Sequence, residues 1–504
     1  MSVILQQFTK FSEKIDSYGV EIQGIHRYLP DERSKKSLFR ELFTVTGLWI
    51  SGCGGLTSMS SYFLGPLIFG LGYRDSFIYG ILGTLIGCLV AAYCSTMGPR
   101  SGLRQMCSAR YLFGRFGVRF VSLVNVVGVL GWSVTNCVLG GEILKSMSGG
   151  GVPLEVGIVI ISVVSLIVAL FGIHYVLKFE TFIGIPVIIV VLLMYPMNHS
   201  AINNESYREL QSYGDYMTVV GDRISFFTLA YSVTATWGGL TSDYYVLLPE
   251  TFPQMTTFIY TFFAIAIPTT FGAVIGILIG NAAVGNELWY DTYESESLGG
   301  LLNLVFGQWN GFGKFLLIIL WLSLITNNVN NSYSSAIDIQ LIDKWFYKHL
   351  PRWFIVFIVF AITLICSMVG KDKFSTILSN FLPMLGYWIS IYTVMLFEEN
   401  VIFRSTSLIK LYTIPSHCTT TCKPYYNFNL WDQEKLQTTG YAATLAFLFG
   451  VAGAILGMNQ VYYRGKLASL IGDYGADLGT FLCFAFPGLT YPLFRYIELK
   501  KLGK

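Results

Sequence analysis

Twelve apolar stretches follow one another along the chain, and short polar segments separate them. Each stretch is long enough to cross a hydrocarbon layer of about 30 Å, which takes about 20 helical residues. A helix can do so because it satisfies its backbone hydrogen bonds within one segment. The pattern therefore predicts an all-α polytopic membrane protein with twelve transmembrane helices. These are expected at 46–72, 76–97, 116–144, 153–174, 180–197, 224–248, 256–281, 312–340, 353–370, 374–396, 439–460 and 475–496.

The first and the sixth apolar stretches each contain a pair of glycines. Gly54 and Gly55 interrupt the first, Gly238 and Gly239 interrupt the sixth, and the pentapeptide Gly-Gly-Leu-Thr-Ser occurs at both places. Each glycine weakens a helix by about 1 kcal/mol relative to alanine. Backbone freed at membrane depth is tolerated only where it faces protein or a water-filled cavity. Paired interruptions of this kind indicate discontinuous helices at the binding site of a secondary transporter.

The two interrupted helices divide the chain into repeats of five helices. Units with an odd number of helices have opposite orientations in the membrane, which is the geometry of an alternating-access carrier. We therefore expect an inverted five-plus-five repeat followed by two further helices. The segments are a cytosolic tail at 1–45, a first repeat at 46–197, an extracellular loop at 198–223, a second repeat at 224–396, a cytosolic loop at 397–438, and the last two helices with the C-terminal tail at 439–504.

Composition and charge agree with a protein that lies mostly in lipid. Hydrophobic residues make up 53% of the 504 residues, charged residues 12%, and the net charge of +3 is too small to suggest a nucleic-acid partner. With the N-terminus inside, 24 of the 33 lysines and arginines fall in cytoplasmic segments. Since cytoplasmic loops carry the excess of these residues, both termini are expected in the cytoplasm.

Two tryptophans and an asparagine are the first candidates for substrate contact. Trp132 and Asn136 are four residues apart in the third helix, so they share one helical face. The alternative is that Trp132 only packs and Asn136 only bonds a neighbouring helix. Trp237 lies at the interruption of the sixth helix, where side chains face the expected cavity. Two indoles from different helices could hold a planar ring, with about 0.5–1.5 kcal/mol per aromatic contact beyond area burial.

The eighth helix contains four asparagines within five residues, Asn327, Asn328, Asn330 and Asn331. Amides are costly in hydrocarbon unless they face partners or water, so the cluster predicts a polar cavity. An amide both donates and accepts hydrogen bonds, and it therefore suits ring nitrogens and hydroxyl groups better than an inorganic ion. The alternative is that these amides pair only with other helices.

Carboxyl groups at membrane depth are functional candidates by default. Glu180 at the start of the fifth helix and Asp243 beyond the interruption of the sixth are the candidates for proton coupling, because proton uptake would neutralise them as substrate binds. Glu142 and Asp338 lie near helix ends, where a structural role is at least as plausible. The hydroxyl groups of the first helix either contact substrate or a cation or allow close helix packing: Ser51, Thr57, Ser58, Ser60 and Ser61.

Metal and enzyme chemistry find little support in the sequence. Cys418 and Cys422 lie near His417, but no second histidine accompanies them. None of the five histidines lies beside a plausible nucleophile, and no glycine-rich phosphate loop occurs. We expect no metal, no cofactor and no enzymatic activity.

Several motifs, in order and on the expected helices, resemble those of the fungal purine–cytosine permease family, which belongs to the nucleobase–cation symporters. The resemblance runs from about residue 20 to the C-terminus. The motifs are Gly65-Pro66, residues 97–106 (MGPRSGLRQM), Arg110-Tyr-Leu-Phe-Gly114, Gly131-Trp-Ser-Val-Thr-Asn136, Thr236-Trp-Gly-Gly239, Asp243-Tyr244, and Asn327-Asn328 with Asn331.

The resemblance implies a plasma-membrane proton symporter with a LeuT-like fold that imports a small planar heterocycle. It also implies a pocket made by Trp132, Asn136, Glu180, Trp237 and Asn331. We expect Asn328 of the asparagine cluster to contact substrate as well. The chain departs from the family at Asn330, where the nucleobase branch typically has proline, and in the Gly/Ser-rich first helix. These departures favour vitamin B6, pyridoxine and related forms, as substrate, with cytosine or a purine as the alternative.

Overall fold

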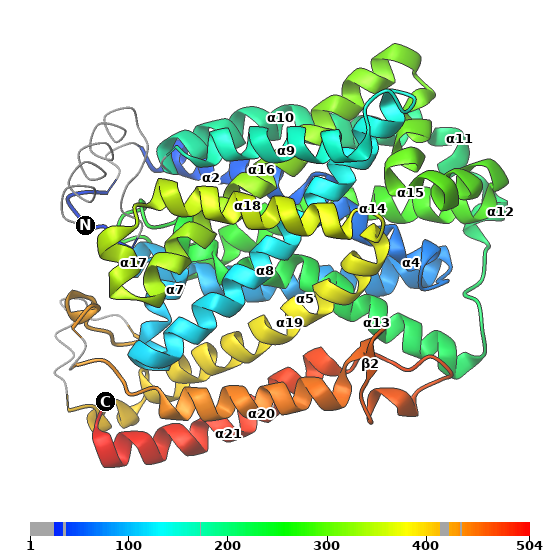
Figure 1. Cartoon of the computed structure of the whole chain (residues 1–504). Coiled ribbons are helices and arrows are strands. Elements are labelled where there is room, and N and C mark those ends of the chain that lie inside the picture. Colours follow the sequence, from blue (N-terminus) through cyan, green and yellow to red (C-terminus); the bar gives the residue numbers. More distant parts are fainter. Residues whose placement is uncertain (1–24, 34–36, 172, 414–422, 434–435) are drawn as a thin grey trace.

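The computed structural model of the chain describes residues 25–33, 37–171, 173–413, 423–433 and 436–504. These residues form a bundle of helices (Figure 1), and the strands found among them are the short pair β1 (Asn459–Gln460) and β2 (Tyr463–Arg464). The predicted all-α class is confirmed. The sequence around Cys418 and Cys422 lies outside the described residues.

The first half of the chain forms a series of long helices in which the first is broken. The described elements are α2 (Leu38–Cys53), α3 (Leu56–Tyr62), α4 (Leu64–Leu67), α5 (Tyr73–Ser95), α6 (Met97–Ser101), α7 (Gln105–Ser108), α8 (Arg110–Met147), α9 (Leu154–Ala169) and α10 (Ile173–Met197). Short helices α11 (His199–Ile202) and α12 (Glu205–Arg208) lead to the second half.

The second half repeats the pattern with a broken first helix. Its elements are α13 (Tyr216–Ala235), η1 (Thr236–Gly239), η2 (Thr241–Tyr244), α14 (Gln254–Gly285), α15 (Glu287–Gly307), α16 (Asn310–Ile342), α17 (Lys344–His349), α18 (Arg352–Gly370) and α19 (Phe374–Glu398). The chain ends with η3 (Glu399–Phe403), η4 (Ser407–Leu411), η5 (Phe428–Leu430), α20 (Tyr441–Gly457), η6 (Ala468–Leu470) and α21 (Gly479–Leu502).

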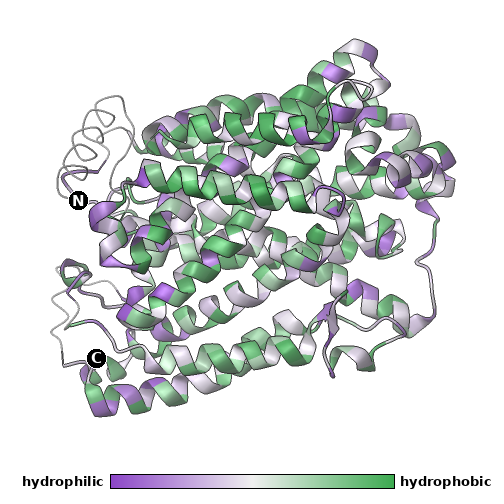
Figure 2. Ribbon diagram, in the orientation of Figure 1, coloured by the Kyte–Doolittle hydropathy of each residue, from purple (hydrophilic) through white to green (hydrophobic). Residues whose placement is uncertain are grey.

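Hydrophobic residues cover the middle of the bundle, and hydrophilic residues gather toward its two ends (Figure 2). Among the described residues, seven helical segments are each long and apolar enough to cross a membrane: Tyr73–Ser101, Arg110–Met147, Tyr175–Met197, Gln254–Gly285, Asn310–Ile342, Arg352–Gly370 and Phe374–Phe403. Helices α9 and α20 are apolar but shorter, with 16 and 17 residues. The chain is thus a multi-pass membrane protein, although fewer helices meet this criterion than the twelve apolar stretches predicted.

Some helix boundaries differ from the predicted ones. Helix α2 begins at Leu38, inside the segment predicted as tail, and α15 occupies a region predicted as a loop. Helix α15 mixes acidic and apolar residues, and the Asn286 side chain caps its first turn by accepting a hydrogen bond from the Trp289 N–H (3.2 Å). A hydropathy window misses such a helix because its first part, residues 287–297, is mostly polar and acidic, and the apolar part that follows is too short to span a membrane.

The two ends of the described chain lie at the same end of the bundle. The first described residues and Lys504 are at the same end of the bundle (Figure 1). There the Arg27 guanidinium donates a hydrogen bond to the Asn429 side chain (2.7 Å), and the Thr413 N–H donates to the Gly503 carbonyl (2.9 Å). The N-terminal and C-terminal segments are therefore tied to the same face.

Helices α5 and α13 cross closely beside the interrupted region. A Cβ atom added to Gly87 of α5 would lie 2.3 Å from the Tyr231 carbonyl oxygen and 2.2 Å from Thr234 Oγ1. Small residues allow helices to approach this closely, and van der Waals packing then holds them together in lipid, where the hydrophobic effect does not act between helices. The close crossing holds the C-terminal end of α13 in place, where the α-helix changes into η1.

Candidate functional site

The first helix is broken at the two glycines that the sequence singled out. Helix α2 ends at Cys53 and α3 begins at Leu56, with Gly55 in an extended conformation between them. The freed Leu56 N–H donates a hydrogen bond to the Ser323 hydroxyl of α16 (2.9 Å). A Cβ atom at Gly55 would lie 2.2 Å from that hydroxyl. The break is thus satisfied by a neighbouring helix, as backbone at membrane depth requires.

The second break lies where α13 changes into the 3₁₀ turns η1 and η2. Its Gly239 carbonyl accepts a hydrogen bond from the Asn125 side chain of α8 (3.1 Å). A Cβ atom at Gly239 would lie 2.2 Å from Asn125 Oδ1, so glycine is needed for this contact. Asn125 also donates to the Asp338 carboxylate of α16 (2.7 Å). One amide therefore ties the break to two other helices.

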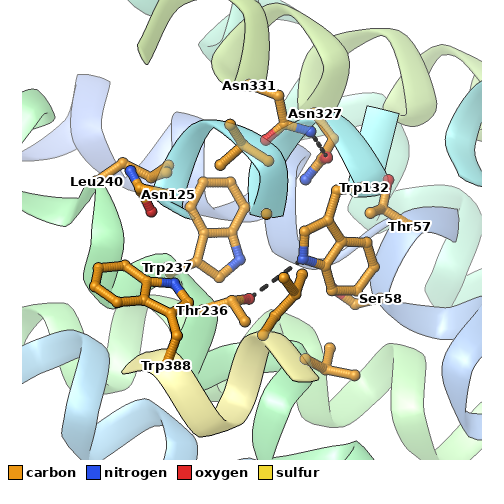
Figure 3. Close-up of a pocket in the computed structure, with 14 residues that line it drawn as sticks. Thr57, Ser58, Asn125, Trp132, Thr236, Trp237, Leu240, Asn327, Asn331 and Trp388 are labelled. Carbon is orange, nitrogen blue, oxygen red and sulfur yellow. Dashed lines mark hydrogen bonds between the residues drawn. The ribbon is translucent and has the colours of Figure 1, made fainter. Parts of the chain in front are cut away.

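A cavity lies between the two breaks, and helices α3, α8, α13, α16 and α19 and the turn η1 contribute to its wall (Figure 3). It is lined by Thr57, Ser58, Asn125, Gly128, Val129, Trp132, Val233, Thr236, Trp237, Leu240, Asn327, Asn331, Leu385 and Trp388. Its volume is about 20 Å³, enough for about one water molecule. In this conformation the cavity is closed down, and its walls must separate to admit a heterocycle.

Three indoles surround this cavity (Figure 3). Trp132 Nε1 donates a hydrogen bond to the Thr236 hydroxyl (3.3 Å), which joins α8 to η1. Trp237 packs edge-to-face on Trp49 of α2, with ring centroids 5.2 Å apart and an interplanar angle of 86°. Trp388 enters from α19. Edge-to-face packing on Trp49 fixes the plane of the Trp237 ring. The ring also lines the cavity.

Two of the four α16 asparagines line the cavity. Asn331 donates to Asn327 Oδ1 (2.9 Å) and to the Ser133 hydroxyl of α8 (3.2 Å). Asn327 donates to the Gly52 carbonyl of α2 (3.2 Å), two residues before the first glycine of the break. The two residues are four apart and share a helical face. They present amide groups to the cavity while joining α16 to the first broken helix.

Asn136 and Asn328 were predicted to contact substrate, but neither lines the cavity. Asn136 lies one turn beyond Trp132 and donates to Asn327 Oδ1 (2.9 Å) and Asn328 Oδ1 (3.0 Å). Asn328 donates away from the cavity, to the thiol of Cys137 (3.4 Å) and the hydroxyl of Ser165 (3.4 Å). One residue along a helix turns a side chain by about 100°, so Asn328 cannot share the face of Asn327. Both amides support the lining residues from behind.

Glu180 also lies behind the cavity wall. It is fully buried and lies about two turns into α10, because the helix begins at Ile173 rather than at Glu180 as predicted. One carboxylate oxygen accepts a hydrogen bond from the Ser51 hydroxyl of α2. The other carboxylate oxygen and both amide atoms of Asn330 have no hydrogen-bond partner among the described residues. Glu180 and Asn330 are therefore buried polar side chains, next to the first broken helix, that lack part of their hydrogen bonding.

Asp243 belongs to a hydrogen-bonded cluster beyond the second break. Its carboxylate accepts from the Gln105 N–H (2.7 Å) and the Ser334 hydroxyl (2.9 Å), and its carbonyl accepts from the Arg104 guanidinium (2.7 Å). Its carboxylate also interacts electrostatically with that of Asp338, which is the acceptor of Asn125. The sequence left a structural and a functional role open for Asp338, and this connection brings it one hydrogen bond away from the cavity wall.

Sequence reasoning did not single out Asn125 or Trp388 as site residues, and it named Asn327 only as a member of the asparagine cluster. Asn125 is seven residues before Trp132, and that spacing places both on one face of α8. A search for polar residues at helical spacing from Trp132 could have found it. Nothing in the periodicity around Trp388 distinguishes it from a packing residue. Of the predicted residues, Trp132, Trp237, Asn327 and Asn331 come together at the cavity, together with the Thr57 and Ser58 hydroxyls of the first broken helix.

A helical membrane bundle with two broken helices around a closed polar and aromatic cavity defines a membrane transporter. Residues 30–475 match the family model described as permease for cytosine/purines, uracil, thiamine, allantoin. The chain belongs to this family of nucleobase–cation symporters, and the resemblance seen in the sequence is confirmed.

Curated relatives align over nearly the whole chain. The chain is 43% identical to the vitamin B6 transporter TPN1 of Saccharomyces cerevisiae over 537 aligned positions, which cover 99% of this chain and 91% of the relative. It is 29% identical to the purine-cytosine permease FCY21 of the same yeast, over 96% of this chain and 88% of the relative. It is 28% identical to the purine-cytosine permease fcyB of Emericella nidulans, with 99% and 92% covered.

The fold is that of Mhp1, a nucleobase-cation-symport-1 family transporter. The chain matches its closed structure with bromovinylhydantoin bound at a TM-score of 0.69 and 14% identity, over 95% of this chain and 96% of that one. Its match to the inward-facing structure of Mhp1 has a TM-score of 0.60 and 16% identity, over 94% and 93%. These likenesses bear on the fold alone.

Proposed function

We propose that this protein imports vitamin B6, pyridoxine and related forms, by proton symport with alternating access. The observation that carries the proposal is the cavity in which Trp132, Trp237 and Asn331 meet between two broken helices. The 43% identity to a yeast vitamin B6 transporter favours this substrate over those of the other relatives. The relatives and the fold are those of transporters, so an enzymatic activity is not proposed.

The proposed substrate is a flat ring with hydroxyl groups. Trp132 and Trp237 provide flat apolar surfaces for the ring, and Asn331 and Asn327 provide donors and acceptors for its hydroxyls and nitrogen. Thr57 and Ser58 of α3 also line the cavity and add two hydroxyl groups. Asn136 and Asn328 then orient the two lining amides rather than contact substrate in this conformation.

The cavity must open before it can hold such a ring. Its volume of about 20 Å³ is far below the 300–1,000 Å³ typical of ligand pockets. Alternating access supplies this change, because rocking of one five-helix unit against the other separates walls that belong to different units. Here Trp132 belongs to the first unit, while Trp237 and Asn331 belong to the second. The two broken helices are the elements expected to move.

The proposed topology has twelve spans in a LeuT-like five-plus-five inverted repeat with two additional helices. The broken helix α2–α4, helices α5 and α8–α10 form the first unit, and α13 to α19 supply the second. Helices α20 and α21 complete the twelve. The excess of lysines and arginines in alternate polar segments, the terminal ones included, supports cytoplasmic termini. We propose the plasma membrane as the location, as the family resemblance implies.

Glu180 and Asp243 are the proposed proton carriers. Glu180 is buried with one oxygen unpartnered, and its Ser51 contact links it to the first broken helix. Asp243 is buried near Asp338, and two negatively charged carboxylates there would repel each other. A buried carboxyl is favoured when neutral, so opening of the site to the outside would load a proton and opening to the inside would release it.

Uptake of labelled pyridoxine into cells that lack their own carrier tests the proposal. Cells expressing this chain should accumulate label above empty-vector cells, and excess unlabelled pyridoxine should block the uptake. Uptake equal to empty-vector cells refutes the vitamin assignment. The second candidate is a proton-coupled cytosine/purine permease, favoured by the family match. Uptake of labelled cytosine that excess cytosine blocks and excess pyridoxine does not block would select that alternative.

A further inference from the structure

A second cavity lies at the end of the bundle opposite the described termini, beside the β1–β2 hairpin (Figure 1). Its walls are the hairpin, the segment before α21, the end of the first broken helix, and the N-terminal halves of α13 and α19. Its volume of about 380 Å³ falls in the range of small-ligand sites. Helices α13 and α19 also line the central cavity, so we call this one the outer cavity.

Hydrogen bonds hold the walls of the outer cavity together. The Val461 N–H at the hairpin turn donates to the Asn380 side chain of α19 (2.6 Å). The Asp477 N–H donates to the Ser225 hydroxyl of α13 (3.0 Å), and the Asp477 carbonyl accepts from the Thr228 hydroxyl of the same helix (3.1 Å). The hairpin and the segment before α21 are thereby fixed to the two helices, and the cavity has its shape before any ligand binds.

A buried amide in the wall has an acceptor without a partner. Gln460 lines the outer cavity and is 6% exposed, and its Nε2 donates to the Tyr387 hydroxyl (3.0 Å) and the Asp477 carboxylate (3.2 Å). These bonds set the orientation of the amide, because an ionised carboxylate only accepts. The Gln460 Oε1 then has no hydrogen-bond partner among the described residues. A buried acceptor of this kind is unfavourable until a donor reaches it.

Two carboxyl groups line the outer cavity, and one of them is open. Asp477 is buried and engaged, since it also accepts from the Tyr387 hydroxyl (2.5 Å) and the Gly479 N–H (2.9 Å). Asp222 of α13 is partly buried, and no hydrogen bond or ion pair involves its carboxylate in the described part of the chain. The open group is therefore an acceptor that carries a negative charge.

The positive charges nearby do not neutralise Asp222. Arg223, the next residue, pairs with Asp75 (2.8 Å). Arg464 of β2 lines the outer cavity and donates to the Asp473 carbonyl (3.0 Å), and it forms no ion pair with any described residue. The lining side chains carry two carboxyl groups against one guanidinium, so the outer cavity favours a cation and Arg464 weakens that preference.

Three exposed tyrosines, Tyr462, Tyr463 and Tyr474, also line the outer cavity. The Tyr462 hydroxyl donates to the Met384 sulfur (2.7 Å), which holds this ring beside α19. Aromatic rings attract cations to their faces, and they also pack against flat heterocycles. The outer cavity thus combines free acceptors, an open carboxylate and aromatic rings, which suit an organic ammonium ion.

We propose that the outer cavity binds a small ring compound that carries a protonated primary amine. Its ammonium group donates hydrogen bonds to the Asp222 carboxylate and to Gln460 Oε1, and its ring lies against the tyrosines. Among forms of the proposed substrate, the outer cavity selects pyridoxamine, which has an amine, over pyridoxine, which has a hydroxyl group in its place. The choice of these two compounds rests on the proposed function, whereas the selection of an amine does not.

An inorganic cation fits the outer cavity less well. It would make no use of the three tyrosines, and the described residues contain no group of three His, Cys, Asp or Glu side chains that could hold a metal ion. The organic ligand uses the charge, the free acceptor and the rings together.

Calorimetric titration of the full chain in detergent compares the two compounds at a pH that keeps the amine protonated. The Trp237→Ala variant is used, because it disables the central cavity and leaves the residues of the outer cavity unchanged. In this background pyridoxamine should bind at least about tenfold more tightly than pyridoxine, since hydrogen bonds to charged groups are the strong ones.

Two substitutions in the same background should act in opposite directions. Asp222→Asn should weaken pyridoxamine binding by about tenfold or more, because the open carboxylate is lost. Arg464→Gln should strengthen it by up to about fivefold, because the one guanidinium of the wall is removed and exposed charges have small effects. Glu209→Gln is the matched control, an exposed acid outside the outer cavity, and should bind like its background. Melting temperatures show whether each variant is folded.

Equal binding of the two compounds overturns the proposal, and so does pyridoxamine binding that Asp222→Asn leaves unchanged or that Arg464→Gln weakens. Calcium ions are titrated separately. Calcium binding that Asp222→Asn removes, without binding of pyridoxamine, also overturns the proposal and assigns the outer cavity to an inorganic cation. Because the central cavity is disabled in every sample, the result does not depend on whether the parent protein takes up pyridoxine.

Discussion

Trp132 Nε1 lies 3.3 Å from Thr236 Oγ1, and this hydrogen bond joins helix α8 to the turn η1, where helix α13 is interrupted. The two residues also line the cavity. Any motion that separates α8 from η1 must break or stretch this bond. We therefore regard it as a contact that holds the closed cavity together.

Replacing Thr236 by valine removes the acceptor and keeps the shape of the side chain. A neutral hydrogen bond contributes about 0.5–1.5 kcal/mol net, so the KM for pyridoxine uptake should change by about two- to tenfold. Initial uptake rates over a range of pyridoxine concentrations measure this. The control is Thr135→Val, because among the described residues the Thr135 hydroxyl bonds only carbonyls of its own helix, those of Gly131 (3.3 Å) and Trp132 (2.8 Å). Equal KM values for both variants would show that the indole–hydroxyl contact has no role in binding.

Trp237→Ala should abolish pyridoxine uptake while the protein still reaches the cell surface. The substitution removes the ring surface at the second break and its edge-to-face contact with Trp49. Trp237→Phe should retain partial uptake because it keeps an aromatic ring. Trp345→Ala is the matched control, since Trp345 is 53% exposed on α17. Normal uptake by Trp237→Ala would remove the ring-binding model.

Asn331 and Asn328 are three residues apart in the same helix but should respond differently to alanine. Asn331→Ala removes an amide from the cavity wall and should raise the KM by about tenfold or more, because hydrogen-bonding groups of the substrate lose their partner. Asn328→Ala leaves the Asn136 amide without one of its acceptors, and it should lower the melting temperature more than it changes substrate preference. Kinetics and thermal melting of both variants separate the two effects. A larger loss of affinity in Asn328→Ala would reverse the assignment.

Glu180→Gln should uncouple uptake from the proton gradient. Glutamine keeps the hydrogen bond to Ser51 but cannot bind or release a proton. Parent uptake should rise as the outside becomes more acidic, because the inward proton gradient then drives accumulation. Uptake by Glu180→Gln should not depend on outside pH and should only equilibrate the vitamin. If the variant still accumulates pyridoxine at acidic pH, the coupling role passes to Asp243, which Asp243→Asn then tests.

Gly55→Ala should destabilise the protein and impair transport. The added methyl group would lie 2.2 Å from the Ser323 side chain, and overpacking in a tight core costs about 1–3 kcal/mol. Gly272→Ala is the matched control on α14, because the nearest atom to its added methyl group is the Gly54 carbonyl at 3.5 Å. Melting temperature and uptake of the two variants provide the comparison. Parent-like stability of Gly55→Ala would mean that the first break tolerates a side chain.

Much of the site was visible in the sequence because its signals are local. Paired glycines mark Gly54-Gly55 and Gly238-Gly239 regardless of what packs around them, since a glycine pair weakens any helix. The asparagine run of α16 and the tryptophan beside the second break stand out for the same reason. Polar residues in an apolar helix require partners wherever the helix lies.

Other features depended on contacts between distant segments. Helix α15 has no long apolar run, because its first part is mostly polar and acidic, so hydropathy alone could not separate it from a loop. The position of Asp338 near a helix end left a structural and a functional role open, and its bond to Asn125 brings it beside the second break. Trp388 faces the cavity only because α19 packs beside η1, and no local pattern carries that information.

The sequence by itself determined the membrane class, the family, the two broken helices and the kinds of side chain at the site, because hydropathy, glycine content and motif order are properties of short segments. The tertiary structure alone decided which amides face the cavity. Asn327 and Asn331 line it, whereas Asn328 and Asn136 support it from behind. The rotation of a helix about its axis is set by its packing against helices that are far away in the chain, and a choice of about 100° between neighbouring residues follows from that rotation.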